Sequence, residues 1–204
     1  LLAPGLPIGP SLDAAVFSHV GGRLLDGVAP YLGAWDHKPP GIYVASAAMQ
    51  AALGWLGPWT GEWLLSLAAT VGLGAAVAAA LARLQVIGWP RMLAAVGATI
   101  LASHYLLALG GGLTEPPATA LAAWALVLAL GPVSRVREVG IGSLVGLSVL
   151  FSIQLLPAGL AVVALALVLP PSGARLRTGT VALGFAAPLA GAAAWLALMG
   201  VLPA

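Results

Sequence analysis

Long apolar runs separated by short polar turns make up most of this 204-residue chain. The runs cover residues 62–84, 92–109, 117–133, 139–169 and 178–202. A helix needs about 20 apolar residues to span a bilayer, and none of the runs alternates polar and apolar residues as a half-buried strand would. The pattern therefore predicts an all-α protein, built as a polytopic transmembrane helical bundle.

The run 139–169 is too long for one crossing. As a single helix it would measure about 46 Å, whereas the hydrocarbon core of a bilayer is about 30 Å thick. Gln154 and Pro157 lie near its middle, and a proline interrupts the hydrogen-bond ladder of a helix. We therefore expect two short helices that form a hairpin.

The first part of the chain is more polar. The stretch "SLDAAVFSHVGGRLLDG" predicts a short amphipathic helix, with Ser11 as N-cap, Asp13 in the first turn and an Asp-Gly pair at the end. Residues 41–56 predict an apolar helix too short to span a membrane comfortably. We divide the chain into an external loop with juxtamembrane amphipathic helices at 1–61 and a transmembrane bundle at 62–204, and we expect both to belong to a larger protein.

The charged residues predict the orientation of this bundle. If 41–56 does not cross and 139–169 crosses twice, one side carries Glu138 and six arginines: Arg83, Arg91, Arg135, Arg137, Arg175 and Arg177. The opposite side carries Asp13, Asp26, Asp36, Glu62 and Glu115. Positively charged turns mark the cytoplasmic side of a membrane. The carboxylate-bearing face is therefore expected to be external.

Composition supports a membrane protein. Hydrophobic residues make up 61% and charged residues 7% of the chain, whereas a soluble domain has about 25% charged residues. The net charge of +2 comes from a few arginines in turns, so it predicts no nucleic-acid partner. The many alanines, glycines and leucines suit a bacterial protein of high genomic GC content, and we expect a multi-pass protein of the bacterial cytoplasmic (inner) membrane.

The stretch "YLGAWDHKPPGIY" is the most unusual part of the chain, because it gathers Asp36, His37 and Lys38 directly before two prolines. A residue before proline is driven to an extended conformation, and each proline fixes its φ angle near −65°. The stretch therefore predicts a rigid strut beside the membrane. A lysine held there suits an anionic phosphate headgroup, while the histidine and carboxylates suit either a divalent metal or proton transfer.

The segment "DAAVFSHVGGRLLDGVAPYLGAWDHKPPGIY" resembles the first external loop of GT-C glycosyltransferases, the membrane enzymes that include protein O-mannosyltransferases and lipid A aminoarabinose transferases. The shared features are Asp13 in a loop helix, the "GVAPY" turn and the strut. The later "GGGLTEPPATAL" is similar to the family's acidic turn, and "GSLVGLSVLFSIQLLPAGLAVV" is similar to its broken helix pair. The resemblance implies transfer of a sugar, with inversion, from a polyprenyl-phosphate-linked donor to a glycan, lipid or protein acceptor at the external face.

The same resemblance implies roles for single residues. Asp13 matches the catalytic base that acts on the acceptor hydroxyl, and Lys38 matches the residue that binds the donor phosphate. His37 and Glu115 match positions where some members gather acidic residues around a divalent metal. Asp36, next to His37 in the sequence, is a further candidate for the site or the metal. The chain departs from the family pattern at Ala14, where many relatives have an acid, and at His37, where some have glutamate. These departures leave the metal site open.

Further polar residues are candidates for substrate binding. His19 and Arg23 lie four residues apart on the first predicted helix, Tyr31 belongs to the "GVAPY" turn, and His104 lies near the external end of its crossing. Gln154, at the predicted helix break, is either a donor-lipid contact or a hydrogen bond between helices. Two other functions stay open: a non-catalytic membrane subunit or degenerate relative, and a lipid-linked sugar transporter or flippase.

Overall fold

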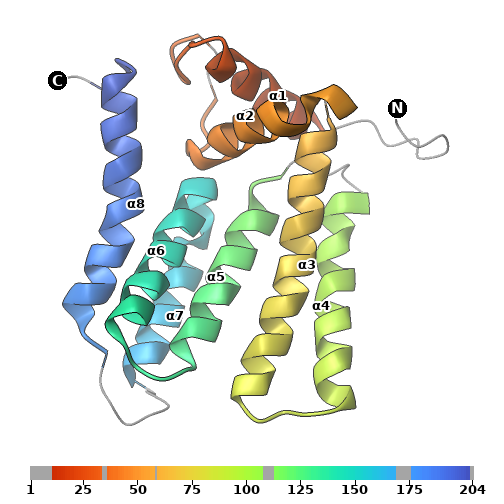
Figure 1. The fold of residues 1–204 in the computed structure, drawn as a ribbon, viewed down its shortest axis with the longest axis vertical. Helices are drawn as coiled ribbons and strands as arrows, with labels where there is room; N and C mark the ends of the chain where they lie inside the picture. Colours follow the sequence, from red (N-terminus) through yellow and green to blue (C-terminus); the bar gives the residue numbers. More distant parts are fainter. Residues whose placement is uncertain (1–10, 34–35, 58, 108–112, 169–175, 203–204) are drawn as a thin grey trace.

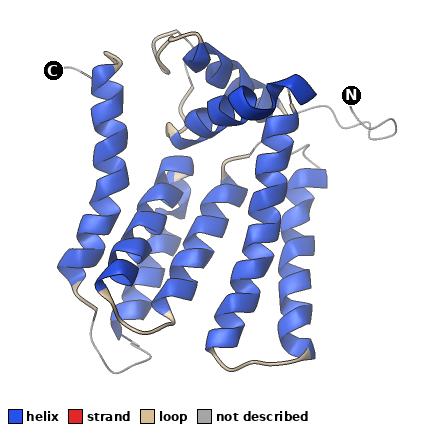
Figure 2. Cartoon of the chain, in the orientation of Figure 1, coloured by secondary structure: helices blue, strands red, loops and turns tan. Residues whose placement is uncertain are grey.

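The computed structural model describes residues 11–33, 36–57, 59–107, 113–168 and 176–202, and at 105–107 it describes only the backbone. Within these ranges all regular secondary structure is helical (Figure 2), so the predicted all-α class is confirmed. The α-helices are α1 (Leu12–Leu25), α2 (Gly41–Leu53), α3 (Thr60–Arg83), α4 (Trp89–Leu107), α5 (Glu115–Ala129), α6 (Arg135–Phe151), α7 (Leu156–Val168) and α8 (Thr178–Leu198). Two short 3₁₀ helices are η1 (Gly54–Leu56) and η2 (Ile153–Leu155).

Helix α1 begins and ends as the sequence predicts. The Ser11 hydroxyl accepts the N–H of Ala14 at 3.0 Å and so satisfies one of the free donors of the first turn. After the last turn Gly27 has a φ of 79°, in the left-handed region that glycine adopts without strain. Phe17 and Val20 are buried on one side of this helix, whereas the apolar residues Val16 and Leu25 are exposed.

Helices α1 and α2 pack together and lie across one end of the bundle (Figure 1). Their shared core consists of Phe17, Val20, Ile42 and Tyr43, all of them buried. The two backbones approach closely at Gly21, where a Cβ atom would lie 2.8 Å from the backbone nitrogen of Ala47. This layer carries Asp13 on α1, and the segment between its two helices carries Asp36, His37 and Lys38.

Helices α3 to α8 form the bundle beneath this layer and run alternately in opposite directions (Figure 1). Small residues permit the closest packing, between α6 and α8: a Cβ atom on Gly146 would lie 2.6 Å from the backbone oxygen of Phe185. The Ser148 hydroxyl of α6 donates to the Ala118 carbonyl of α5 at 2.8 Å. Small side chains and hydroxyl-to-carbonyl hydrogen bonds are typical contacts between helices in lipid.

The predicted interruption of residues 139–169 is confirmed. Helix α6 ends at Phe151, Ser152 is extended with φ −149° and ψ 112°, and η2 leads directly into α7. Pro157 is the second residue of α7, where no hydrogen bond of the ladder is lost because first-turn N–H groups have no partner in the helix. The chain therefore reverses at the same end of the bundle as the α1–α2 layer (Figure 1).

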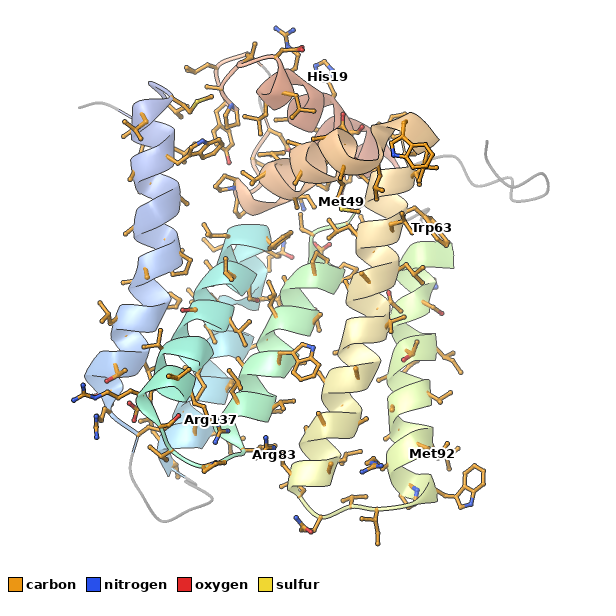
Figure 3. The ribbon with its side chains drawn as sticks, viewed as in Figure 1. His19, Met49, Trp63, Arg83, Met92 and Arg137 are labelled. Carbon is orange, nitrogen blue, oxygen red and sulfur yellow. The ribbon has the colours of Figure 1, made fainter. Side chains whose placement is uncertain are left out.

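The charged residues of the bundle divide between its two ends. Arg83 and Arg137 lie at the end away from α1 and α2, whereas His19 lies on the outer side of that layer (Figure 3). Glu62 and Glu115 begin α3 and α5 at the layer end. Within the described residues, the predicted Arg83, Arg91, Arg135, Arg137 and Arg177 therefore lie at one end together with Glu138, and the other carboxylates lie at the opposite end together with Arg23 and Lys38. Arg175 lies outside the described residues. That the carboxylate end is external stays a prediction.

Two described helices, Thr60–Arg83 and Thr178–Leu198, are long and apolar enough to cross a membrane, and Gly41–Leu56, Glu115–Ala129 and Ile153–Val168 are shorter apolar helices. These lengths support membrane association. The multi-pass topology and the division into a loop at 1–61 and a bundle at 62–204 remain predictions.

Candidate functional site

The strut is shaped by the turn that precedes it. Tyr31 has a φ of 69°, a left-handed conformation that is uncommon for a residue with a side chain. This conformation accompanies a hydrogen bond from the Tyr31 hydroxyl to the backbone carbonyl of Lys38, at 2.7 Å. The turn thereby fixes the backbone of the residue that carries the ammonium group. Ala34 and Trp35, which complete the motif, lie outside the described residues.

Asp36 is held from two directions. One carboxylate oxygen accepts the backbone N–H of His37 at 2.7 Å and lies 3.0 Å from Nδ1 of the same histidine. The other accepts the Tyr43 hydroxyl at 2.8 Å. The Asp36 side chain is 15% exposed and that of His37 is 74% exposed. Asp36 therefore anchors the strut to α2, and His37 extends into solvent beside it.

Three aromatic rings support this arrangement. The ring centroid of Tyr43 lies 6.0 Å from that of Phe17 and 5.8 Å from that of Tyr31, both in edge-to-face geometry that aromatic pairs favour. Burial, followed by the negative charge of Asp36, raises the pKa of Tyr31 to about 12. Burial and then the hydrogen bond to Asp36 raise the pKa of Tyr43 as well. Both phenols therefore stay protonated, as hydrogen-bond donors, at neutral pH.

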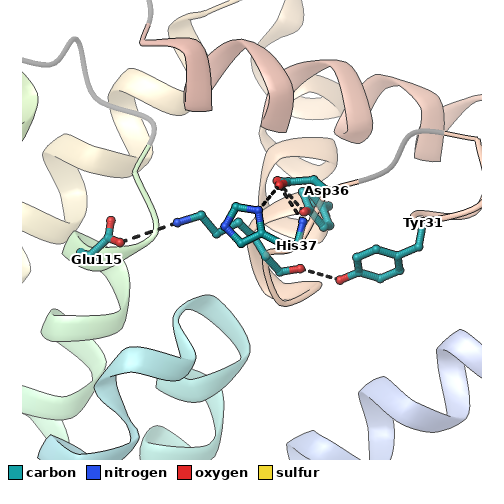
Figure 4. A network of polar contacts seen from close by, with 6 residues as sticks. Tyr31, Asp36, His37 and Glu115 are labelled. Carbon is teal, nitrogen blue, oxygen red and sulfur yellow. Dashed lines mark hydrogen bonds and ion pairs between the residues drawn. The ribbon is translucent and has the colours of Figure 1, made fainter.

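The strut also reaches the start of α5. The Lys38 ammonium lies 3.9 Å from a carboxylate oxygen of Glu115, with side-chain exposures of 18% and 28% (Figure 4). Hydrogen bonds between nitrogen and oxygen span about 2.7–3.2 Å, so this pair attracts by charge without a direct hydrogen bond. Two residues that the sequence analysis assigned separately to the external face are thus brought together.

Asp13 is placed differently. It is exposed in the first turn of α1, and within the described residues no hydrogen bond or ion pair joins it to the strut. Residues three to four positions apart share one side of a helix, so Asp13 lies one turn before Phe17, whose ring packs on Tyr43. The predicted base therefore lies one helical turn from the aromatic group along α1, with its own side chain exposed.

The remaining candidates lie on other elements in the part of the chain that the structure describes. Arg23 pairs with Asp26 on the surface of α1 at 3.4 Å, and His19 projects outward (Figure 3). His104 is exposed near the end of α4, and Gln154 is exposed in η2. Their predicted roles in substrate binding stay predictions.

The sequence analysis missed a buried polar chain that connects the layer to the bundle. The Gln50 amide donates to the Ser18 carbonyl at 2.7 Å and to the Ser46 hydroxyl at 3.2 Å. The Ser46 hydroxyl in turn donates to Glu62, which is 2% exposed and whose other carboxylate oxygen is buried without a partner. The sequence signal for this hydrogen-bonded network is a serine and a glutamine four residues apart on an otherwise apolar helix.

The carboxylates do not converge as a metal site requires. Both oxygens of Asp36 accept hydrogen bonds, Glu115 faces Lys38, and the described residues contain no group of three His, Cys, Asp or Glu side chains that could hold a metal. Divalent cations need several oxygen ligands at once. The described residues therefore bring no such set of ligands together, and the divalent metal that the resemblance left open stays a prediction.

Comparison with known proteins gives no match: no protein-family profile, no curated protein and no solved structure is significantly similar to this chain.

Proposed function

We propose that this chain is part of an integral membrane GT-C glycosyltransferase that moves a sugar from a polyprenyl phosphate to an acceptor on the external face of a bacterial inner membrane. The observation that supports it best is the position of Lys38. Its backbone is fixed by Tyr31, its side chain is mostly buried, and its ammonium has no hydrogen-bond acceptor among the described residues. An ammonium held in this way suits a phosphate group.

The reaction is a single displacement. Asp13 accepts the proton of the acceptor hydroxyl, and the resulting oxygen attacks the anomeric carbon of the sugar as the bond from that carbon to the phosphate oxygen breaks. The polyprenyl phosphate leaves with the bonding electrons, and Lys38 stabilises its added negative charge. Because attack and departure occur on opposite sides of one carbon, the configuration is inverted.

Two sets of contacts support the positions of Asp13 and Lys38. The aromatic group formed by Phe17, Tyr31 and Tyr43 packs α1 against α2, so it relates the helix that carries Asp13 to the strut that carries Lys38. The buried chain from Ser18 to Glu62 attaches both helices to α3. Transfer reactions depend strongly on such positioning, since well-oriented groups lower the barrier by several kcal/mol.

The test is a transfer assay in membranes that contain the full-length protein, with a panel of labelled hexosyl and pentosyl polyprenyl phosphates. Asp13→Asn and Lys38→Ala should each lower transfer by at least about a hundredfold, as expected for loss of a general base or of charge stabilisation. Asp26→Asn is the matched control, because Asp26 is an exposed acid of the same segment whose ion pair is with the exposed Arg23. Full transfer by a folded Asp13→Asn protein would refute the assignment of the base.

A further inference from the structure

The contact between Lys38 and Glu115 is unusual for a mostly buried ion pair. At 3.9 Å the two charged groups attract each other, but the distance exceeds that of a hydrogen bond. Buried ammonium groups normally donate hydrogen bonds, because leaving their donors unused costs free energy. Lys38 is therefore only partly satisfied by its protein partner, and a better acceptor can replace that partner.

Glu115 is equally lightly held. It is the first residue of α5, and Pro116 and Pro117 follow it, so the next two positions of the helix offer no backbone N–H to its carboxylate. Thr114 does not cap the helix through its side chain, and its buried hydroxyl has no hydrogen-bond partner among the described residues. Within the described residues, the polar side-chain contact of Glu115 is with Lys38. Its carboxylate can leave without breaking other contacts.

We propose that Glu115 is the internal counterion of Lys38 and that the phosphate of the polyprenyl donor displaces Glu115 from the ammonium. This inference rests on the proposed function of Lys38. A sugar linked to a polyprenyl phosphate is a phosphodiester with one negative charge, the same charge as the carboxylate it replaces. Exchange therefore leaves Lys38 neutralised in both states. The phosphate differs by coming close enough to accept hydrogen bonds from the ammonium.

The exchange also affects product release. Transfer of the sugar leaves polyprenyl monophosphate, and a phosphate monoester carries about −1.5 to −2 charges at pH 7, so the product binds Lys38 more strongly than the donor does. Glu115 competes with this product for the ammonium. Removal of the carboxylate should therefore lower KM for the donor and lower kcat through slow product release, whereas loss of a metal ligand would raise KM or abolish activity.

The test measures binding of undecaprenyl phosphate to the full-length protein in phosphatidylcholine nanodiscs, with neutral undecaprenol as the comparison ligand. Glu115→Gln should bind undecaprenyl phosphate about three- to tenfold more tightly than the wild type, as expected for removal of a partly exposed ion-pair partner. Glu115→Asp keeps the charge on a shorter side chain, so its affinity for undecaprenyl phosphate should lie between those of the wild type and Glu115→Gln. Lys38→Ala should weaken binding at least about tenfold, and Asp26→Asn should leave it unchanged.

The outcomes separate the two proposals. Unchanged or weaker binding by Glu115→Gln, together with weaker binding by Lys38→Ala, would overturn the counterion role and leave the phosphate site intact. Equal binding of undecaprenyl phosphate by the wild type and Lys38→Ala would overturn the phosphate site and with it the counterion role. The same titration in phosphatidylglycerol nanodiscs identifies the source of the phosphate: if that lipid removes the effects of both substitutions, Lys38 binds the bilayer and not the donor.

Discussion

The hydrogen bond between Tyr43 and Asp36 gives the sharpest prediction about the strut. Tyr43→Phe removes the hydroxyl that donates to Asp36 at 2.8 Å and keeps the fully buried ring in its contacts with Phe17 and Tyr31. A hydrogen bond to a charged group contributes about 1.5–3 kcal/mol. In this variant Asp36 still accepts the N–H of His37 at 2.7 Å. We therefore expect the free energy of unfolding to fall by about 1.5–2 kcal/mol, near the lower end of that range.

Reversible unfolding by denaturant in mixed micelles measures this loss, and the affinity for undecaprenyl phosphate measures its effect on Lys38. Tyr31→Phe is the matched control, because its hydroxyl donates at 2.7 Å to a neutral carbonyl of Lys38, a bond that contributes about 0.5–1.5 kcal/mol. Tyr43→Phe should therefore cost more than Tyr31→Phe and should also weaken phosphate binding. An equal or smaller cost for Tyr43→Phe would refute the idea that it anchors Asp36.

Three further predictions concern pH, the buried polar chain and topology. The pKa of Tyr31 is raised from 10.0 to about 12, so the stability that Tyr31 contributes is complete below pH 10 and is lost as the pH rises to about 12. Between these pH values the free energy of unfolding should fall less in Tyr31→Phe than in the wild type. An equal fall in both proteins would contradict this prediction. Ser46→Ala should lower the free energy of unfolding by about 1.5–3 kcal/mol in the same assay, because it removes the donor to a buried carboxylate. Glu62→Gln should lower it less, because the glutamine side chain still accepts the hydrogen bond from Ser46. The reverse order would show that the carboxylate charge itself stabilises the fold. The chain has no cysteine, so single cysteines can report the topology. An impermeant maleimide should label cysteines at Leu25 and Ile153 from outside, and should label cysteines at Ile87 and Val136 only after permeabilisation. Labelling from outside at one position of each pair would exclude the predicted topology.

Local signals in the sequence were sufficient for much of the fold. The N-cap at Ser11 and the Asp26-Gly27 end of α1 depend on contacts within a few residues, so capping rules predict them. The break near Gln154 follows from helix length and a proline. The structure places it at Ser152, two residues earlier, because a proline is accommodated in the first turn of the next helix.

The supports of the candidate site depend on packing between distant segments, which local patterns do not specify. Tyr43 reads as one more apolar residue of a short helix, and its role comes from the ring of Phe17 and the carboxylate of Asp36. Glu62 reads as an interfacial acid, yet the contact of α2 with α3 buries it against Ser46. The sequence predicted one face for Lys38 and Glu115 but could not predict that their side chains meet.

In the proposed membrane orientation, the positions of the charged residues along the helices support the proposed enzyme over the transporter alternative. A transporter or flippase must stabilise polar cargo near the middle of the bilayer, and charged or polar groups at that depth are its usual mark. Every Asp, Glu, Lys and Arg among the described residues lies outside the helices or in a terminal turn. The buried polar groups farther inside, such as Thr70 and Ser148, are hydroxyls, and Ser148 already donates to a helix carbonyl. The proposed action on a phosphate at the headgroup level needs charge only at or beside the ends of the helices, and Lys38, Glu115 and Asp13 lie there.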